Sequence, residues 1–191
     1  MVWFAMAAAG FGLLFLGDIN SVSWKNRLLA PAFFCGFALI AAAAAGDLYT
    51  ALRHTPLAGA KLLWLALGVL SCAALCYCLF FAVPFGESYL EDQKERRVCR
   101  SGVYALCRHS GVWCFGAACL FFGAAAWPAG LIWRGLCYTA LDVLYSYFQD
   151  RFIFPRVFTD HGDYCRSVPF LIPTKQSLCR FLKGGKKEER A

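Results

Sequence analysis

Two stretches of this chain gather residues that can bind charged small molecules. The first, SGVYALCRHSGVW, holds Tyr104, Arg108 and His109 at the edge of a long apolar run. The second contains Gln149 and Asp150, again where an apolar run gives way to charged sequence. A guanidinium or an imidazole can bind a carboxylate, and a carboxylate can bind an ammonium group. The two stretches therefore predict the two halves of a pocket for a charged cofactor.

The approach to the second stretch carries polar residues at helical spacing. Asp142, Ser146 and Gln149 recur at intervals of four and three residues, which places them on one face of a helix. A carboxylate inside a membrane span costs about 2.5 to 3.5 kcal/mol on insertion scales, so Asp142 should face protein or water. It is expected either to form the floor of a polar cavity open beside Tyr147, or to hydrogen-bond Tyr138 or a backbone group.

The composition indicates that the natural solvent of these helices is a membrane. The 191 residues are 60% hydrophobic and 16% charged, and the mean hydropathy is +0.53. A hydrocarbon core of about 30 Å requires about 20 apolar residues per helix. We therefore expect an all-α, polytopic integral membrane protein with about five transmembrane helices, over roughly residues 2–16, 28–45, 62–83, 112–132 and 136–148.

The distribution of basic residues predicts the orientation. Lys and Arg gather in the loops after the first and third predicted helices and in the C-terminal part, whereas the opposite loops hold Arg53, Lys61 and Arg134. By the positive-inside rule, the N-terminus lies outside and the C-terminus in the cytosol. The expected location is a bacterial plasma membrane or, otherwise, the endoplasmic reticulum membrane. Topology and anionic headgroups explain the net charge of +7 better than nucleic acid does, and no nucleic-acid partner is expected. The sequence indicates no oligomeric state.

The eleven cysteines do not by themselves predict chemistry. Most fall inside predicted spans, where a thiol packs as a small apolar residue. Four lie on the predicted cytosolic side, where disulfides are not expected: Cys99, Cys107, Cys165 and Cys179. Because Cys76 and Cys78 lack the spacing of a zinc or redox motif, no metal site is expected.

The chain is expected to form a single membrane domain with three parts. Residues 1–84 read as a three-helix membrane anchor in which nothing suggests chemistry, and residues 85–173 as the part that carries it. Residues 174–191 are basic and read as a flexible tail. The connector GESYLEDQKERRVCR has acids first and bases last, which predicts an amphipathic helix on the membrane surface.

Two further segments lead to separate expectations. Residues 164–173 are too apolar to stay in water, so we expect them to fold back against the membrane face as a cap over the cofactor. The dipeptide Arg53-His54 repeats Arg108-His109 but lies on the predicted outer side, where a solvated loop explains it. Snorkelling towards headgroups would by itself also explain Arg108 and His109.

Both charged stretches resemble motifs of one membrane-enzyme superfamily. The run RRVCRSGVYALCRHSG resembles the G-x-Y-x-x-x-R-H-P signature of the isoprenylcysteine carboxyl methyltransferase and phospholipid methyltransferase superfamily, with Gly102, Tyr104, Arg108 and His109 at matching positions. The run QDRFIFPRVFTDHGDYCRSVPFLIP resembles that superfamily's E-E-x-x-L, Y-x-x-Y-like and V-P-x-x-I-P elements. The resemblance covers about residues 95–173, and the two blocks flank a helical hairpin, as in the superfamily.

This resemblance implies an integral-membrane methyltransferase that uses S-adenosylmethionine in an all-helical pocket. A methyl group would pass to a lipid or lipid-linked acceptor with a carboxylate or an amine. The cofactor-binding residues would be Gly102, Tyr104, Arg108, His109, Tyr147, Gln149 and Asp150. Arg108 or His109 would bind the cofactor's carboxylate and Asp150 its ammonium group. The expected catalytic residues are His109, Arg108 and Asp142, of which His109 or Asp142 could take the proton from an amine acceptor.

Several residues depart from the motifs. Ser110 replaces the motif proline, Val112 stands where an aromatic is usual, Gln149 replaces the first glutamate, and Asp150 shortens the second. Because the charge at position 149 is lost, one alternative is a catalytically inactive member that serves as a membrane binding or scaffold protein. A small transporter is a third possibility, but it would require polar residues in several spans, and the sequence suggests only Asp142.

Overall fold

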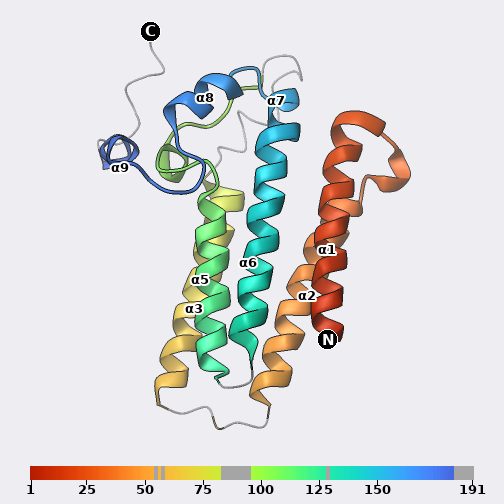
Figure 1. Cartoon of the computed structure of the whole chain (residues 1–191), viewed down its shortest axis with the longest axis vertical. Helices are drawn as coiled ribbons and strands as arrows, with labels where there is room; N and C mark the ends of the chain where they lie inside the picture. Colours follow the sequence, from red (N-terminus) through yellow and green to blue (C-terminus); the bar gives the residue numbers. More distant parts are fainter. Residues whose placement is uncertain (54–55, 57–58, 83–95, 128–129, 183–191) are drawn as a thin grey trace.

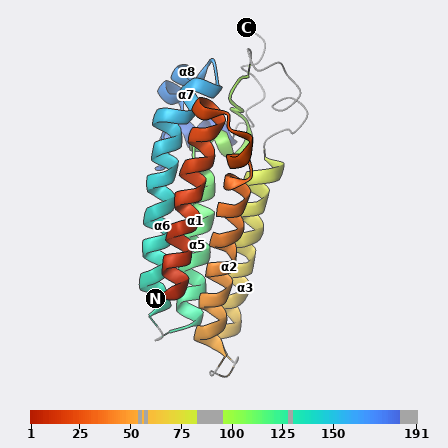
Figure 2. The same cartoon turned by 90° about the vertical axis from the view of Figure 1, so that its right-hand side faces the viewer.

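The computed structural model describes residues 1–53, 56, 59–82, 96–127 and 130–182. Within these ranges all regular structure is helical, which confirms the all-α expectation for this part of the chain. The long helices are α1 (Val2–Ile19), α2 (Ala32–Leu52), α3 (Ala60–Cys76), α5 (Ser110–Ala125) and α6 (Leu131–Phe148). They lie side by side and alternate in direction along the chain (Figures 1 and 2).

Short elements gather mainly at one end of the long helices. The π-helical turns η1 (Asn20–Trp24) and η3 (Tyr77–Phe81) extend α1 and α3, and a third, η5 (Gln149–Ile153), extends α6. The remaining short elements are the 3-10 turns η2 (Arg27–Leu29) and η4 (Gly102–Ala105) and the helices α7 (Phe154–Val157), α8 (His161–Ser167) and α9 (Lys175–Leu182). Figure 1 shows α7, α8 and α9 at this same end.

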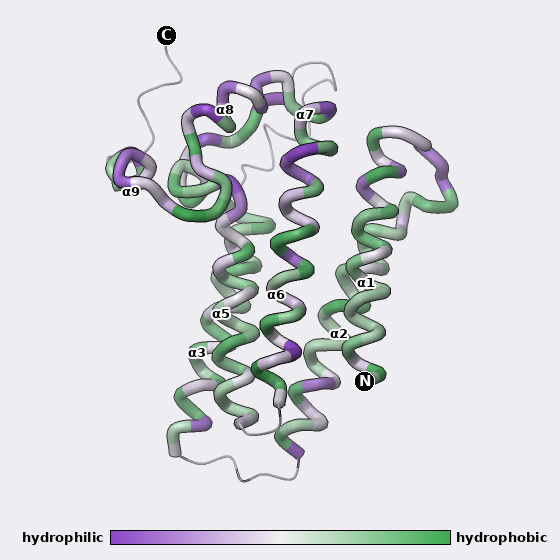
Figure 3. Tube along the Cα trace, viewed as in Figure 1, coloured by the Kyte–Doolittle hydropathy of each residue, from purple (hydrophilic) through white to green (hydrophobic). Residues whose placement is uncertain are grey.

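The first three long helices have the length and composition of membrane spans. In the part of the chain that the structure describes, three continuous helices are long and apolar enough to cross a bilayer: Val2–Trp24, Arg27–Leu52 and Ala60–Phe81. Helix α5 is apolar but shorter. Figure 3 shows hydrophobic residues along the long helices and many hydrophilic ones at the end that carries α7 and α8. This pattern is compatible with an integral membrane protein.

The first two helices are longer than the sequence suggested. α1 continues to Ile19 and α2 to Leu52, whereas we expected the apolar stretches to end at residues 16 and 45. The extra turns bring Asp18 and Asp47 inside helices, where both are buried. Residues 1–84 therefore contain buried acidic groups that the sequence analysis placed in loops.

The turn between α5 and α6 also lies elsewhere than expected. α5 ends at Ala125 and α6 begins at Leu131, although the sequence suggested spans of 112–132 and 136–148. Gly130 precedes α6 with a φ of 72°. Such a left-handed backbone favours glycine and stops a continuous helix before this point. The corrected α6 gains a turn, which includes Arg134.

Close backbone contacts define two groups of helices. In the α1–α2 pair, a Cβ at Gly36 would lie 2.6 Å from the carbonyl oxygen of Gly10, so the helices cross at a distance that only glycine permits. In the second group, α5 packs against both α3 and α6. A Cβ at Gly68 in α3 would lie 2.4 Å from the Phe122 ring of α5.

The two groups are joined mainly through α6. Tyr138 packs with Ala7 and Ala43, and Tyr145 packs with Phe11 and Leu14. Polar bonds reinforce these contacts at both ends of α6. Arg134 Nε lies 2.7 Å from Asp47 Oδ2, and the Tyr138 hydroxyl donates to the same oxygen over 3.2 Å. At the opposite end, the Tyr145 hydroxyl donates to Asp18.

Some expectations fall on residues outside the described ranges. The amphipathic surface helix over residues 86–100 is described only from 96 onwards, where the chain is not helical. His54 also lies outside the described residues. Residues 175–182, expected to be part of a flexible tail, instead form α9, in which Ser177 is buried. Residues 183–191 of that expected tail lie outside the described part.

Candidate functional site

The first charged stretch is held in place by a turn and two tyrosines. Gly102 has a φ of 58° and begins the 3-10 turn η4. The Tyr104 hydroxyl donates to the carbonyl oxygen of Cys78 over 2.7 Å. The Tyr164 hydroxyl in turn donates to the carbonyl oxygen of Tyr104 over 2.8 Å. These bonds attach the approach to α5 both to the end of α3 and to α8.

The segment after α8 folds back onto the same stretch. The backbone N–H groups of Arg108 and His109 donate to the carbonyl oxygens of Pro169 and Phe170, over 3.0 and 3.3 Å. The Trp113 indole N–H donates to the carbonyl oxygen of Leu171 over 2.8 Å. The expected fold-back of residues 164–173 is thus confirmed for its contact with the start of α5.

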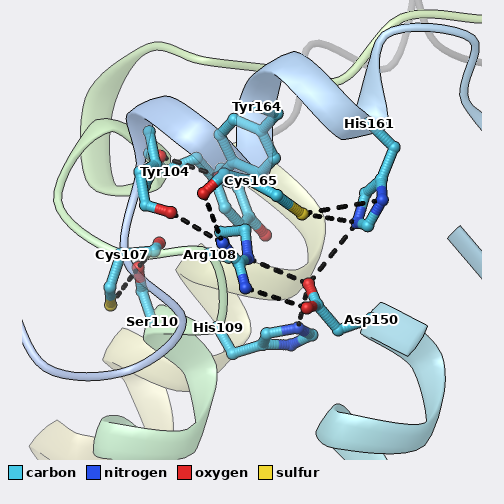
Figure 4. A network of polar contacts seen from close by, with 10 residues as sticks. Tyr104, Cys107, Arg108, His109, Ser110, Asp150, His161, Tyr164 and Cys165 are labelled. Atoms are coloured by element: carbon cyan, nitrogen blue, oxygen red, sulfur yellow. Dashed lines mark hydrogen bonds and ion pairs between the residues drawn. The ribbon is translucent and has the colours of Figure 1, made fainter. Parts of the chain in front are cut away.

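Arg108 and Asp150 form the centre of the site (Figure 4). Arg108 Nε donates to Asp150 Oδ1 and Arg108 Nη2 to Asp150 Oδ2, each over 2.9 Å. Its remaining nitrogen, Nη1, donates to the carbonyl oxygens of Cys165 and Val168 over 3.1 and 2.8 Å. The two charged side chains are only 12% and 13% exposed. The fold therefore brings both predicted halves together, and the two charges neutralise each other.

Two imidazoles also face Asp150. Nε2 of His109 lies 3.5 Å and Nε2 of His161 lies 3.4 Å from Asp150 Oδ1. Burial by itself raises the pKa of Asp150, but the His109 ring and the Arg108 guanidinium outweigh this effect and lower the pKa to about 2. Asp150 is therefore an anion at neutral pH. His109 Nε2 is buried without a hydrogen-bond partner.

Aromatic rings fix the orientation of the basic residues. The His109 ring stacks on Phe154, with centroids 5.7 Å apart and planes inclined by 7°, and meets the edge of Phe170 at 5.0 Å. The Arg108 guanidinium carbon lies 5.7 Å from the centroid of Phe170. Phe170 therefore contacts both residues, and its position in the folded-back segment explains why this segment is part of the site.

A cavity of about 360 Å³ lies beside this cluster and is lined by residues of α1, α2, α3, α5 and α6. Its volume is within the range of about 300 to 1,000 Å³ that is typical of small-molecule sites. The wall is mostly apolar, and Phe37 of α2 and Leu79 of η3 contribute to it. Of the predicted site residues, those that line the cavity are Tyr104, Arg108, His109, Asp142 and Gln149.

Asp142 lines this cavity. The expected cavity was polar and open beside Tyr147, Gln149 and Asp150, whereas this one has a mostly apolar wall to which only Gln149 of the three contributes. Within the described part of the chain the Asp142 carboxylate has no hydrogen-bond or ion-pair partner. The other alternative, a hydrogen bond to Tyr138, is not formed, because the Tyr138 hydroxyl bonds Asp47. Gln149 extends its amide to Asp18, which its Nε2 reaches over 2.8 Å.

Other predicted residues lie outside the cavity wall. Tyr147 is 54% exposed and meets the edge of Phe170. Gly102 acts through its backbone conformation, and a Cβ there would meet no atom within 4 Å. Asp150 lines a second cavity of about 420 Å³, on the other side of Arg108, together with His161 and Cys165.

Sequence reasoning overlooked three residues at or near the site. Asp18 escaped notice because it was placed after the end of the first helix. His161 and Cys165 were not proposed, although their spacing of four residues places both on one face of a helix. In the structure the Cys165 sulfur lies 3.5 Å from His161 Nε2. The four-residue spacing of His161 and Cys165 was the signal available in the sequence. It points to a polar site only because Asp150 lies beside both residues in the folded protein.

The chain matches no protein-family model, no curated protein and no solved structure.

Proposed function

We propose that this protein is an integral-membrane methyltransferase that transfers a methyl group from S-adenosylmethionine to a lipid or lipid-linked acceptor. The observation that supports this most is the paired contact of Arg108 with Asp150, which are 42 residues apart. Each lies in one of the two stretches that resemble the motifs of isoprenylcysteine carboxyl methyltransferases and phospholipid methyltransferases. The contact lies beside a cavity large enough for a small molecule.

The proposal includes five membrane crossings, by α1, α2, α3, α5 and α6. The helices alternate in direction, so with the N-terminus outside the loops rich in Lys and Arg all face the cytosol. Arg134 and the end of α2 then lie on the outer side. The site lies at the cytosolic end, where a soluble cofactor can enter. The proposed location remains a bacterial plasma membrane or, otherwise, the endoplasmic reticulum membrane.

The residues present fit a zwitterionic cofactor with an adenine ring. His109 lines the cavity, and its buried Nε2 has no hydrogen-bond partner, although it lies 3.5 Å from Asp150 Oδ1; a ligand could supply the missing hydrogen bond. Tyr104, Arg108, His109 and Gln149 would hold the cofactor from this wall. Asp150 would act by positioning Arg108, because it does not itself line the cavity.

The bound cofactor would supply a methyl group on a positively charged sulfur, which leaves readily. The protein's task is then to hold the acceptor in line and to exclude water, which can contribute about 7 to 11 kcal/mol to lowering the barrier. The apolar wall provided by α1, α2 and α3 suits a lipid-linked acceptor. Asp142 lies where it could take a proton from an amine acceptor.

The test is direct binding of S-adenosylmethionine to the full-length protein in detergent, measured by calorimetry. Arg108→Gln and His109→Ala should each weaken binding at least about tenfold, since a hydrogen bond to a charged group contributes about 1.5 to 3 kcal/mol. The control is Arg100→Gln, because Arg100 pairs with Asp160 in an exposed position outside the cavity wall. No binding by the unaltered protein, or equal loss in all three variants, would contradict the proposal.

One observation favours an inactive binding or scaffold protein as the second candidate. Arg108 and Asp150 already satisfy each other, so neither charge is free for a ligand unless their bond opens. Transfer is assayed by mass spectrometry of lipids from cells with and without the protein, looking for the added mass of one methylene group. Binding of the cofactor without any such product would support this second candidate over the enzyme.

A further inference from the structure

A cluster of three possible metal ligands lies in the second cavity, behind Arg108. Asp150 Oδ1, His161 Nε2 and Cys165 Sγ belong to a group whose ligand atoms all lie within 4.8 Å of one another. Figure 4 shows the three side chains pointing toward one another, from η5 and from α8. We propose that Asp150, His161 and Cys165 bind a divalent transition-metal ion of the zinc type, a site that the sequence analysis did not expect.

Two of the three distances match those of a tetrahedral site. With metal–nitrogen and metal–oxygen bonds of about 2.0 Å and a metal–sulfur bond of about 2.3 Å, tetrahedral ligand atoms lie about 3.3 to 3.5 Å apart. Here the distance from His161 Nε2 to Asp150 Oδ1 is 3.4 Å. The distance from His161 Nε2 to Cys165 Sγ is 3.5 Å. The third pair, Asp150 and Cys165, lies within 4.8 Å, and a small movement of these two side chains would bring them to a common ion.

The identity of the donors selects the kind of metal. A thiolate and an imidazole favour zinc and similar ions, whereas magnesium and calcium prefer oxygen ligands alone. His161 is 7% exposed and Asp150 13% exposed. The second cavity, of about 420 Å³, gives an ion access to all three residues.

A second imidazole faces the same carboxylate from the first cavity. His109 Nε2 lies 3.5 Å from Asp150 Oδ1, the oxygen that His161 also faces. His109 lines the first cavity and His161 the second, so the three proposed ligands are those of the second cavity alone. Asp150 Oδ2 would stay bonded to Arg108 Nη2.

Metal binding has a defined proton balance. The Cys165 thiol must lose its proton, so one S–H bond is replaced by one metal–sulfur bond and one proton enters the solvent. Burial raises the pKa of Cys165, while Arg108 lowers it. The metal affinity should therefore increase with pH across the neutral range.

The experiment adds Zn²⁺ or Co²⁺ to the full-length protein in detergent, without S-adenosylmethionine. Zinc should bind one to one, with one proton released into a weak buffer, and cobalt should give a thiolate-to-metal charge-transfer absorption. Cys165→Ser should remove this absorption and lower the zinc affinity at least about tenfold. His161→Gln should lower the zinc affinity by a similar factor. Cys165→His should keep the zinc affinity but lose the absorption, which separates loss of a ligand from loss of folding.

The matched control is Cys179→Ser, because Cys179 is an exposed thiol in α9. This variant should behave like the unaltered protein. A cobalt absorption that persists in Cys165→Ser, or equal zinc affinity in all these proteins, overturns the proposal. The outcome is independent of the proposed enzyme function, since cofactor binding is measured separately in the presence of a chelator.

Discussion

The Tyr145 hydroxyl in α6 donates a 2.6 Å hydrogen bond to the carboxylate of Asp18 in α1. Gln149 Nε2, one turn further along, donates to the same carboxylate oxygen over 2.8 Å and to the Tyr145 hydroxyl over 2.8 Å. Three polar groups from two helices thus satisfy one another at the margin of the cavity. This triad is the polar link between the α1–α2 pair and the remainder of the fold at the end that carries the site.

Removal of the Tyr145 hydroxyl should destabilise the protein. Tyr145→Phe leaves the buried Asp18 carboxylate with one donor fewer, which costs about 1 to 3 kcal/mol. The midpoint of thermal unfolding in detergent measures the effect. Tyr147→Phe is the control, because Tyr147 is exposed, and it should leave the midpoint unchanged. An unchanged midpoint in Tyr145→Phe would show that the triad does not contribute to stability.

Asp142 should behave in the opposite way. Its carboxylate has no hydrogen-bond or ion-pair partner among the described residues, so Asp142→Asn breaks no such interaction. We expect the variant to be at least as stable as the unaltered protein, with a gain of up to about 3 kcal/mol. Thermal unfolding of this variant beside the unaltered protein is the measurement. A lowered midpoint in Asp142→Asn would mean that the carboxylate has a stabilising partner.

Arg108→Gln should destabilise the protein strongly, apart from any effect on ligands. The substitution removes the guanidinium that forms two hydrogen bonds with the buried Asp150, and loss of one member of a buried pair costs about 3 to 5 kcal/mol. Arg166→Gln is the comparison, since Arg166 and its partner Asp163 are 81% and 66% exposed. That exposed pair should contribute less than about 1 kcal/mol. Denaturant unfolding of both variants distinguishes the two cases.

The stability should depend on pH through Asp150. Its pKa falls from 3.8 to about 2 in the folded protein, so below pH 4 the unfolded chain binds more protons than the folded one. The stabilisation is therefore complete above about pH 4 and is lost as the pH falls towards 2, by up to about 2 kcal/mol. Unfolding as a function of pH should show this decline, and the decline should be smaller in Asp150→Asn. An equal loss of stability with falling pH in both proteins would show that groups other than Asp150 cause it.

The helix crossing of α1 and α2 should tolerate no larger residue. In Gly36→Ala, the new Cβ would lie 2.6 Å from a backbone oxygen of Gly10, so the helices must separate, at a cost of about 1 to 3 kcal/mol. Gly12→Ala is a matched control on α1, because a Cβ there would meet no atom within 4 Å. The control should be neutral or slightly stabilising. Similar midpoints for both variants would contradict the observed crossing.

The sequence predicted well what depends on local pattern. Long apolar runs indicated the helices. The ends of α5 and α6 were wrong, because the conformation of Gly130 is not visible in a hydropathy pattern. The sequence predicted that Arg108 and Asp150 would lie in the same region, on two sides of a ligand, but not that they would bond each other directly.

Contacts between distant residues were beyond sequence reasoning. Asp18 finds its partner Tyr145 at a separation of 127 residues, and Asp47 finds Tyr138 at 91. No spacing rule connects such positions, since the packing of α6 between the two groups of helices decides them. For the same reason His161 and Cys165 were recognised as a pair only once the fold placed Asp150 beside them.

The folded-back segment has a consequence for biosynthesis. Arg108 bonds the carbonyl oxygen of Val168, which the ribosome adds 60 residues later. By the time that bond can form, α5 and α6 have already been synthesised. The two helices are therefore complete while the guanidinium still lacks this partner, and a nascent chain interrupted before residue 168 would contain the long helices without a completed site.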